Sequence, residues 1–299
     1  MKNTCSLCPR NCNVDRINHF GFCGATKNAK IAKVMLHYFE EPIISGSSET
    51  KKCGSGAIFF SHCTLKCVYC QNYEISRGSI GKEVNSKDLA NIFKKLENLG
   101  ATNINLVTPT HYTDAIINAL KIYRPNIPIV WNTSGYESQE TIKKLAGYID
   151  IYLTDFKYYS DELALKYSKC PNYFESASNS LLEMKKQIPE DIIVDGLMKK
   201  GIIVRHLILP THSDDSKKIF NWIKENIGTD IMISLMSQYT PCEKYENYPE
   251  LNNKIKPLEY KIVENYIKNL GFNNGYLQDA DSASKDFIPE FKKSSEIKF

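Results

Sequence analysis

The chain has 299 residues, of which 42% are hydrophobic and 24% are charged, so it is long enough to bury a full core as one large domain or two average ones. Its formal net charge of +4 is small for this length, and it predicts neither a nucleic-acid partner nor a membrane partner. We also find no apolar signal stretch and no apolar run long enough to span a bilayer, so we expect a cytoplasmic protein.

The first cysteines along the chain form a group of four, Cys5, Cys8, Cys12 and Cys23. Clustered thiols in a reducing cytoplasm favour metal binding over disulfides. Four thiolates suit a tetrahedral zinc ion or an iron–sulfur cluster, and the spacing does not decide between the two. The alternative is a set of free thiols in a loop-rich arm. We interpret residues 1–43 as an N-terminal cysteine-rich, metal-binding module.

A second group of thiols, Cys63, Cys67 and Cys70, follows an apolar, strand-like segment over residues 57–60. Three thiolates on one short loop can hold three irons of a cubane, because thiolate is the usual protein ligand of such clusters. The fourth iron is then open to another ligand. A zinc knuckle or three unrelated thiols would be the alternative, but no fourth ligand stands nearby in the sequence.

The spacing C-x3-C-x2-C, with an aromatic residue before the last cysteine, resembles the signature of radical S-adenosylmethionine (SAM) enzymes. The resemblance implies a [4Fe-4S] cluster whose open iron binds the amino and carboxylate groups of SAM. It also implies that an electron from the cluster cleaves a carbon–sulfur bond to give the 5'-deoxyadenosyl radical, and that the segment around Tyr69 lies against the adenine.

Strands and helices alternate after the thiol loop, which is the pattern of a parallel sheet built from βα units. Strands are predicted over residues 103–109, 127–131, 149–157, 202–210 and 231–238. Helices are predicted over residues 86–99, with Ser86 as the capping residue, over 113–123, 138–146, 216–226 and 257–270, and from residues 162 and 173. With the strand before the thiols, six units predict a partial (β/α)6 barrel over residues 44–275, followed by a polar tail over 276–299.

Polar residues follow the predicted strand ends, where the loops of an α/β barrel converge on one mouth. Asp155 and Lys157 are two residues apart, so they point to one side of their strand. They could hold a ribose hydroxyl and a carboxylate of SAM, or they could form an ordinary ion pair. The other residues expected to contact SAM or substrate are Tyr69, Thr108, Thr110, His111, Asn132, Ser134, Arg205 and Gln238.

Longer motifs carry a closer resemblance that spans nearly the whole chain. They include residues 5–12, 40–46, 70–76, 105–111, 150–158, 205–210 and 236–239, and they look like the radical SAM proteins known as pyruvate formate-lyase activating enzyme-like. The resemblance implies an oxidoreductase suited to anaerobic conditions. It also implies a low-potential electron donor such as a flavodoxin or a ferredoxin-like protein.

This chain differs from the activating enzymes in the segment that holds the SAM amino group through its backbone. Activating enzymes carry Gly-Gly-Glu-Pro after the second strand, whereas this chain has Val107-Thr108-Pro109-Thr110-His111. We therefore expect one of two reactions for the radical: activation of a glycyl-radical protein, or modification of a small molecule or peptide. The alternative is a non-catalytic iron–sulfur protein that transfers electrons or senses iron, which would not need the polar loops at the strand ends.

Overall fold

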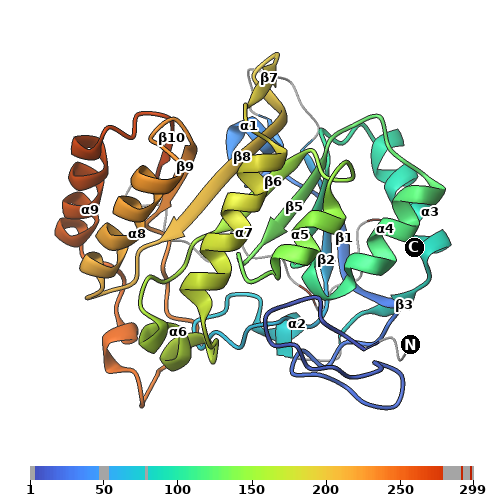
Figure 1. Ribbon diagram of the computed structural model, residues 1–299, viewed down its shortest axis with the longest axis horizontal. Coiled ribbons are helices and arrows are strands. Elements are labelled where there is room, and N and C mark those ends of the chain that lie inside the picture. Colours follow the sequence, from blue (N-terminus) through green and yellow to red (C-terminus); the bar gives the residue numbers. More distant parts are fainter. Residues whose placement is uncertain (1–3, 47–53, 78–79, 279–290, 292–296, 298–299) are drawn as a thin grey trace.

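The computed structural model describes residues 4–46, 54–77, 80–278, 291 and 297, and these residues form an α/β fold around one sheet (Figure 1). The order of strands across the sheet is β10-β9-β8-β6-β5-β4-β2-β1-β3, and β7 pairs with β8. The edge strands β10 and β3 are not paired with each other in this order. The sheet is therefore an open, partial barrel, as predicted.

Across the sheet from β10 to β2, neighbouring strands run parallel to one another. Their bounds are β2 Ser55–Phe60, β4 Ile104–Val107, β5 Ile129–Thr133, β6 Ile151–Asp155, β8 Leu197–Leu207, β9 Met232–Met236 and β10 Gly275–Leu277. All but β10 correspond to the six predicted strands, which are thereby confirmed. Every residue of β2 and β4 is buried, because a parallel sheet is covered on both faces.

Three strands are antiparallel to their neighbours and were not predicted. β1 (Ala29–His37) pairs with β2, β3 (Lys82–Val84) pairs with β1, and β7 (Ile192–Val194) pairs with β8. Because β1 belongs to the sheet, the sheet begins inside the segment that we interpreted as the N-terminal module. The predicted tail over residues 276–299 lies largely outside the described residues.

Helices cover the outer face of the sheet (Figure 1). They are α3 Ser86–Asn98, α4 Thr113–Ile122, α5 Gln139–Leu145, α7 Tyr173–Gln187, α8 Ser213–Asn226 and α9 Pro257–Leu270, and α6 Asp161–Ser168 lies at the carboxyl end of the strands. Shorter pieces are α1 Pro42–Ser45, α2 Tyr73–Arg77, and the 3-10 helices η1 Thr110–Tyr112 and η2 Pro249–Asn252.

The N-cap of α3 differs from the prediction by one residue. The side chain of Asn85 accepts hydrogen bonds from the backbone N–H groups of Lys87 and Asp88, at 2.9 and 3.0 Å. Asn85 therefore caps the helix and Ser86 is its first residue. An amide oxygen caps a helix as well as a hydroxyl does, so residue type alone did not decide between these neighbours.

Among the described residues, buried apolar side chains form three clusters. The largest lies under the outer helices, and alternation along the strands points the strand residues of the other two toward the inside of the barrel. Ile43 and Ile44 of α1 enter the barrel and pack with Val130, Ile151 and Ile203. This apolar floor closes the barrel below the carboxyl ends of its strands. None of the helices in the described part of the chain is long and apolar enough to cross a membrane.

Candidate functional site

A cavity of about 570 Å³ lies at the carboxyl ends of the parallel strands. This volume falls in the range of small-molecule sites, about 300–1,000 Å³. All three thiols of the second cysteine group line it, together with the predicted contact residues Tyr69, Thr108, Asn132, Ser134, Asp155, Lys157, Arg205 and Gln238. The structure therefore brings together residues that are up to 175 positions apart in the chain (238 − 63).

The thiol loop is held by α6 and the residues around it. The backbone N–H of Lys66 donates to the carbonyl oxygen of Ser168 at 3.0 Å, and that of Val68 donates to Tyr167 at 2.8 Å. The Ser168 hydroxyl also donates to Sγ of Cys67 at 2.9 Å. A donor aimed at a cysteine sulfur stabilises its thiolate form, which is the form that binds metal.

The chemistry of the three thiols fits a cluster better than a single ion. Burial raises the pKa of Cys63 to about 12 and also raises the pKa of Cys67, although the Lys157 ammonium opposes the second shift. Bound metal would have to stabilise these thiolates. Within residues 4–46, 54–77 and 80–278, no three His, Cys, Asp or Glu side chains lie close enough to hold one metal ion. Three thiolates that each bind a different iron do not need to be that close.

Tyr69 lines the cavity at the start of a buried chain of hydroxyl groups. Its hydroxyl lies 2.6 Å from that of Tyr158, which in turn lies 2.7 Å from the Ser168 hydroxyl. The Tyr69 ring packs edge-on against Tyr239. These contacts fix the segment between Cys67 and Cys70 in one orientation.

Asp155 and Lys157 form an ion pair in the cavity wall, with 2.5 Å between Lys157 Nζ and Asp155 Oδ2. Burial favours a lower pKa for Lys157, but the Asp155 carboxylate and the Cys67 sulfur outweigh it and raise the pKa. The Lys157 side chain is therefore charged at neutral pH. The predicted proximity of the two residues is confirmed, and Cys67 lies within range of the same cation.

Tyr173 connects this pair to the neighbouring loop after β5. Its hydroxyl donates to the carbonyl oxygen of Ser134 at 2.8 Å and accepts from the Lys157 backbone N–H at 2.8 Å. Gly135 has φ +78°, and a Cβ at this position would lie 2.3 Å from the carbonyl oxygen of Asp155. Only glycine allows the two loops to approach this closely.

Arg205 is paired at the cavity floor with two carboxylates that sequence analysis did not assign to the site. Its Nε and Nη2 donate to the two carboxylate oxygens of Glu41 at 2.7 and 2.5 Å, and Nη2 also contacts Glu40. Asn105 donates to Glu40 at 2.8 Å. Glu40 and Glu41 stand in one of the motifs quoted above, but their loop enters the barrel from β1, a strand that was not predicted.

Thr110 and His111 do not line this cavity, unlike the other predicted contact residues. The Thr110 hydroxyl donates to Glu137 at 2.6 Å, and Nε2 of His111 donates to the carbonyl oxygen of Ser61 at 2.8 Å. Burial lowers the pKa of His111 to about 3, so its ring is neutral. Thr108 has φ +59° and lines the cavity, and its unusual backbone turns the next residues away into η1.

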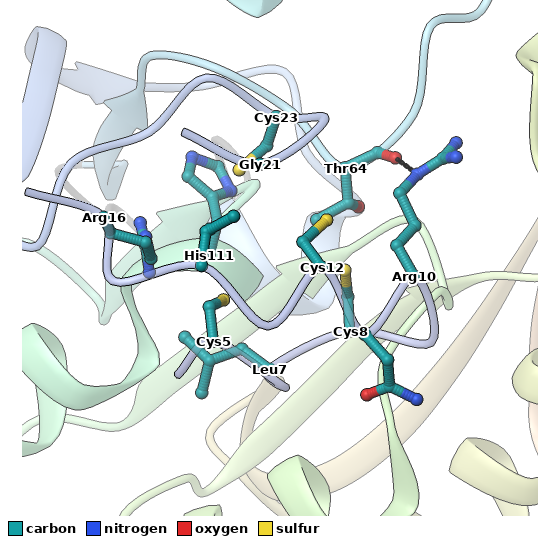
Figure 2. A pocket seen from close by; sticks show the side chains of 12 residues that line it. Cys5, Leu7, Cys8, Arg10, Cys12, Arg16, Gly21, Cys23, Thr64 and His111 are labelled. Atoms are coloured by element: carbon teal, nitrogen blue, oxygen red, sulfur yellow. Dashed lines mark hydrogen bonds between the residues drawn. The ribbon is translucent and has the colours of Figure 1, made fainter. Parts of the chain in front are cut away.

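The four cysteines of the N-terminal arm line a separate, smaller cavity of about 10 Å³. Figure 2 shows the sulfur atoms of Cys5, Cys8, Cys12 and Cys23 facing a common space. Burial raises the pKa of Cys8 to about 12 and also raises the pKa of Cys23. The arm that carries them has neither helix nor strand between residues 4 and 28, yet it brings all four predicted ligands together.

Comparison with known proteins gives a family match, a relative by sequence and similar solved structures. The family model "Radical SAM superfamily" matches residues 57–223. An uncharacterized protein of Methanocaldococcus jannaschii is 32% identical over 274 residues, which cover 88% of this chain and 73% of that protein.

Similar solved structures have low sequence identity, and one of them, a methyltransferase, shows the same fold. A radical SAM methyltransferase from Sphaerobacter thermophilus superposes with a TM-score of 0.51 at 10% identity, covering 77% of this chain and 69% of that one. SuiB of Streptococcus suis, solved with bound S-adenosylmethionine, has a TM-score of 0.48 at 15% identity over 73% of this chain. The chain spans about half the length of SuiB, 48%.

Proposed function

Because this chain belongs to the radical SAM superfamily, we propose that Cys63, Cys67 and Cys70 hold a [4Fe-4S] cluster and that the adjoining cavity binds SAM. When bound, the cluster supplies one electron that cleaves SAM to methionine and the 5'-deoxyadenosyl radical, which takes a hydrogen atom from substrate. One observation carries the proposal: the three thiols and eight strand-end residues chosen for SAM contact line the same cavity.

The cavity residues divide the binding of SAM among several loops. Asp155 and Lys157 offer a carboxylate and an ammonium for the ribose hydroxyls and the carboxylate of SAM, and Asn132 and Ser134 offer neutral donors and acceptors beside them. The segment around Tyr69 is proposed to lie against the adenine, and Thr108 to offer a backbone carbonyl and a hydroxyl. Arg205, paired with Glu40 and Glu41 at the cavity floor, and Gln238 in the wall are proposed to contact SAM or substrate.

The substrate of the radical is either a glycyl-radical protein or a small molecule or peptide. The activating-enzyme resemblance supports the first, and the altered segment at residues 107–111 supports the second. In both cases the electron comes from a low-potential donor of the flavodoxin or ferredoxin class. The free thiols of the described chain support a reducing, cytoplasmic location. The N-terminal thiols are proposed to bind zinc or a second iron–sulfur cluster.

Anaerobic reconstitution tests the proposed reaction. The protein is loaded with iron and sulfide, reduced with dithionite and mixed with SAM, and 5'-deoxyadenosine is measured by chromatography. We expect product from the wild type and none from a Cys63→Ala/Cys67→Ala/Cys70→Ala variant. A wild-type protein with an intact cluster spectrum that forms no 5'-deoxyadenosine would instead be a non-catalytic iron–sulfur protein.

A further inference from the structure

We propose that Cys5, Cys8, Cys12 and Cys23 bind a second [4Fe-4S] cluster, not zinc, and that this cluster passes electrons to the one on Cys63, Cys67 and Cys70. The electron-transfer part of this inference rests on the proposed function. An external donor of the flavodoxin or ferredoxin class reduces the second cluster by one electron, and the second cluster is reoxidised when it reduces the first. No atom is transferred in this step.

The spacing of the four sulfurs favours a cluster. A zinc ion would draw them to about 2.3 Å from its centre, which leaves no room for a water-sized void between them. The four side chains instead line a cavity of about 10 Å³, which is room for about one water molecule. The described part of the chain also holds no three ligand side chains at single-ion spacing. Four irons, each bound to one sulfur, suit four sulfurs that stand back from a common centre.

The walls of this cavity carry positive charge. Arg10 and Arg16 both line it, and Arg16 is only 7% exposed. Arg16 donates to the carbonyl oxygens of Ala25 and Thr26 at 3.1 and 2.5 Å, and no carboxylate in the described residues pairs with it. A [4Fe-4S] cluster with four thiolates is anionic, so it would supply the missing negative charge.

An unpartnered nitrogen also lies in the cavity wall. Nδ1 of His111 is buried and has no hydrogen-bond partner in the described residues, while Nε2 of the same ring is used by Ser61. Because Nε2 carries the proton of the neutral ring, Nδ1 is an acceptor, so it suits a water molecule beside the site and does not distinguish a cluster from zinc. His111 was predicted to contact SAM, but it lines the N-terminal cavity instead.

The N-terminal cavity shares a wall with the thiol loop, and this contact supports electron transfer. Nδ1 of His62 lies 3.1 Å from the carbonyl oxygen of Cys23. Nε of Arg10 donates to the carbonyl oxygen of Thr64 at 2.7 Å, and Figure 2 shows this bond. His62 and Thr64 are the two neighbours of Cys63 in the chain. On the other side, Asn11 and Asn13 beside Cys12 are exposed, so a donor protein can approach.

Metal analysis tests the site without relying on catalysis. In the Cys63→Ala/Cys67→Ala/Cys70→Ala variant, reconstituted anaerobically with iron and sulfide in the presence of zinc, we expect about four irons and four sulfides per chain. Dithionite should produce the electron paramagnetic resonance signal of a reduced cluster, and SAM should not alter it. One zinc and no iron per chain, or no metal at all, would overturn the proposal.

Gly21 provides a variant that disturbs the site while all four thiols remain. A Cβ at Gly21 would lie 2.9 Å from Sγ and 3.1 Å from Cβ of Cys12. In the triple-variant background, Gly21→Ala should lower iron content by at least twofold. Cys170→Ala, which removes a buried thiol outside both groups, is the matched control and should retain the iron. Equal iron in both variants would contradict the assigned cavity.

Electron transfer is tested by comparing two reductants. The variant Cys5→Ala/Cys8→Ala/Cys12→Ala/Cys23→Ala should show at least a tenfold fall in the ratio of flavodoxin-driven to dithionite-driven 5'-deoxyadenosine formation. An unchanged ratio would overturn the electron-transfer role and leave the second cluster structural. Failure of the wild type to form 5'-deoxyadenosine with either reductant would count against the proposed function, but the metal analysis would still decide the site.

Discussion

Nδ1 of His62 lies 3.1 Å from the carbonyl oxygen of Cys23, so the residue before the first thiol of the loop contacts the last thiol-bearing residue of the N-terminal arm. His62 itself has φ +72°, an unusual backbone conformation that directs its ring toward the arm. Burial lowers the pKa of His62, and nearby Lys30 lowers it further. The neutral ring therefore acts as the donor to Cys23.

Loss of this hydrogen bond should loosen the arm. We expect His62→Leu to cost about 1 kcal/mol of local stability, which raises the rate of protease cleavage within residues 4–28 about fivefold. His19→Gln is the control, because the His19 side chain is 77% exposed on the same arm. Limited proteolysis followed by mass spectrometry gives both rates, and equal rates would show that the contact does not hold the arm.

The pairing of Arg205 with Glu40 and Glu41 predicts a large stability effect. Arg205→Met leaves two carboxylates with little solvent contact and no cation, which should cost about 3–5 kcal/mol in the free energy of unfolding. Arg124→Met removes a more exposed pair with Asp150, at 2.7 Å, and should cost about 1 kcal/mol or less. Urea unfolding of both variants measures the difference. Similar losses would mean that the barrel floor tolerates an unpaired carboxylate.

Much of the fold was readable from the sequence, because apolar runs and helix caps depend on neighbouring residues. The strands after Cys70 are such runs, and all of them were predicted apart from the short β7 and β10 and the edge strand β3. Glu40 was missed because its place in the barrel depends on the pairing of β1 with β2, which no local pattern shows. Likewise, the side of the sheet to which His111 points depends on the positive φ angle of Thr108. The amino-acid type at position 108 does not predict this angle.

The left-handed backbone at Thr108 predicts a difference in stability between the variants Thr108→Gly and Thr108→Ala. Its φ of +59° is unfavourable for any residue with a Cβ, and most of all for a β-branched one. Thr108→Gly should therefore be more stable than Thr108→Ala by about 1 kcal/mol, because alanine keeps the strained Cβ and glycine does not. Thermal unfolding of the two variants checks this order. A more stable alanine variant would show that Thr108 has no strain to relieve.

The environment of Glu250 should make the free energy of unfolding depend on pH. Burial favours a higher pKa, but hydrogen bonds from Lys166 and Tyr167 outweigh it and lower the pKa of Glu250 from 4.5 to about 2. A carboxyl with a depressed folded-state pKa contributes stability that is present above 4.5 and is lost as pH falls toward 2.

The variant Glu250→Gln removes this contribution. Its stability deficit should be about 1 kcal/mol near pH 6 and should shrink as the pH is lowered toward about 3. Glu246→Gln, which removes an exposed carboxylate in the loop just before η2, is the control and should keep the wild-type pH profile. Urea unfolding across this pH range measures both profiles. A deficit for Glu250→Gln that is the same at every pH would contradict the assigned pKa.

Asp155 and Lys157 should act on SAM as a unit. Each is the partner of the other at 2.5 Å, so Asp155→Asn leaves the Lys157 ammonium unbalanced and Lys157→Met leaves the carboxylate unbalanced. We expect each substitution to weaken SAM binding about tenfold, which corresponds to about 1.4 kcal/mol. In the double variant, the affinity for SAM should fall about tenfold, not a hundredfold. The first substitution already leaves the other charge without its partner, so removing that second charge costs little more.

Calorimetric titration of SAM into the reconstituted, oxidised protein measures these affinities, and the iron content of each sample separates loss of SAM contact from loss of the cluster. Asp150→Asn is the control: Asp150 pairs with Arg124 just before β6 and does not line the cavity. Its affinity should stay within about twofold of the wild type. Independent, multiplying losses at Asp155 and Lys157 would show two separate contacts with SAM, and no loss at either would place SAM elsewhere in the cavity.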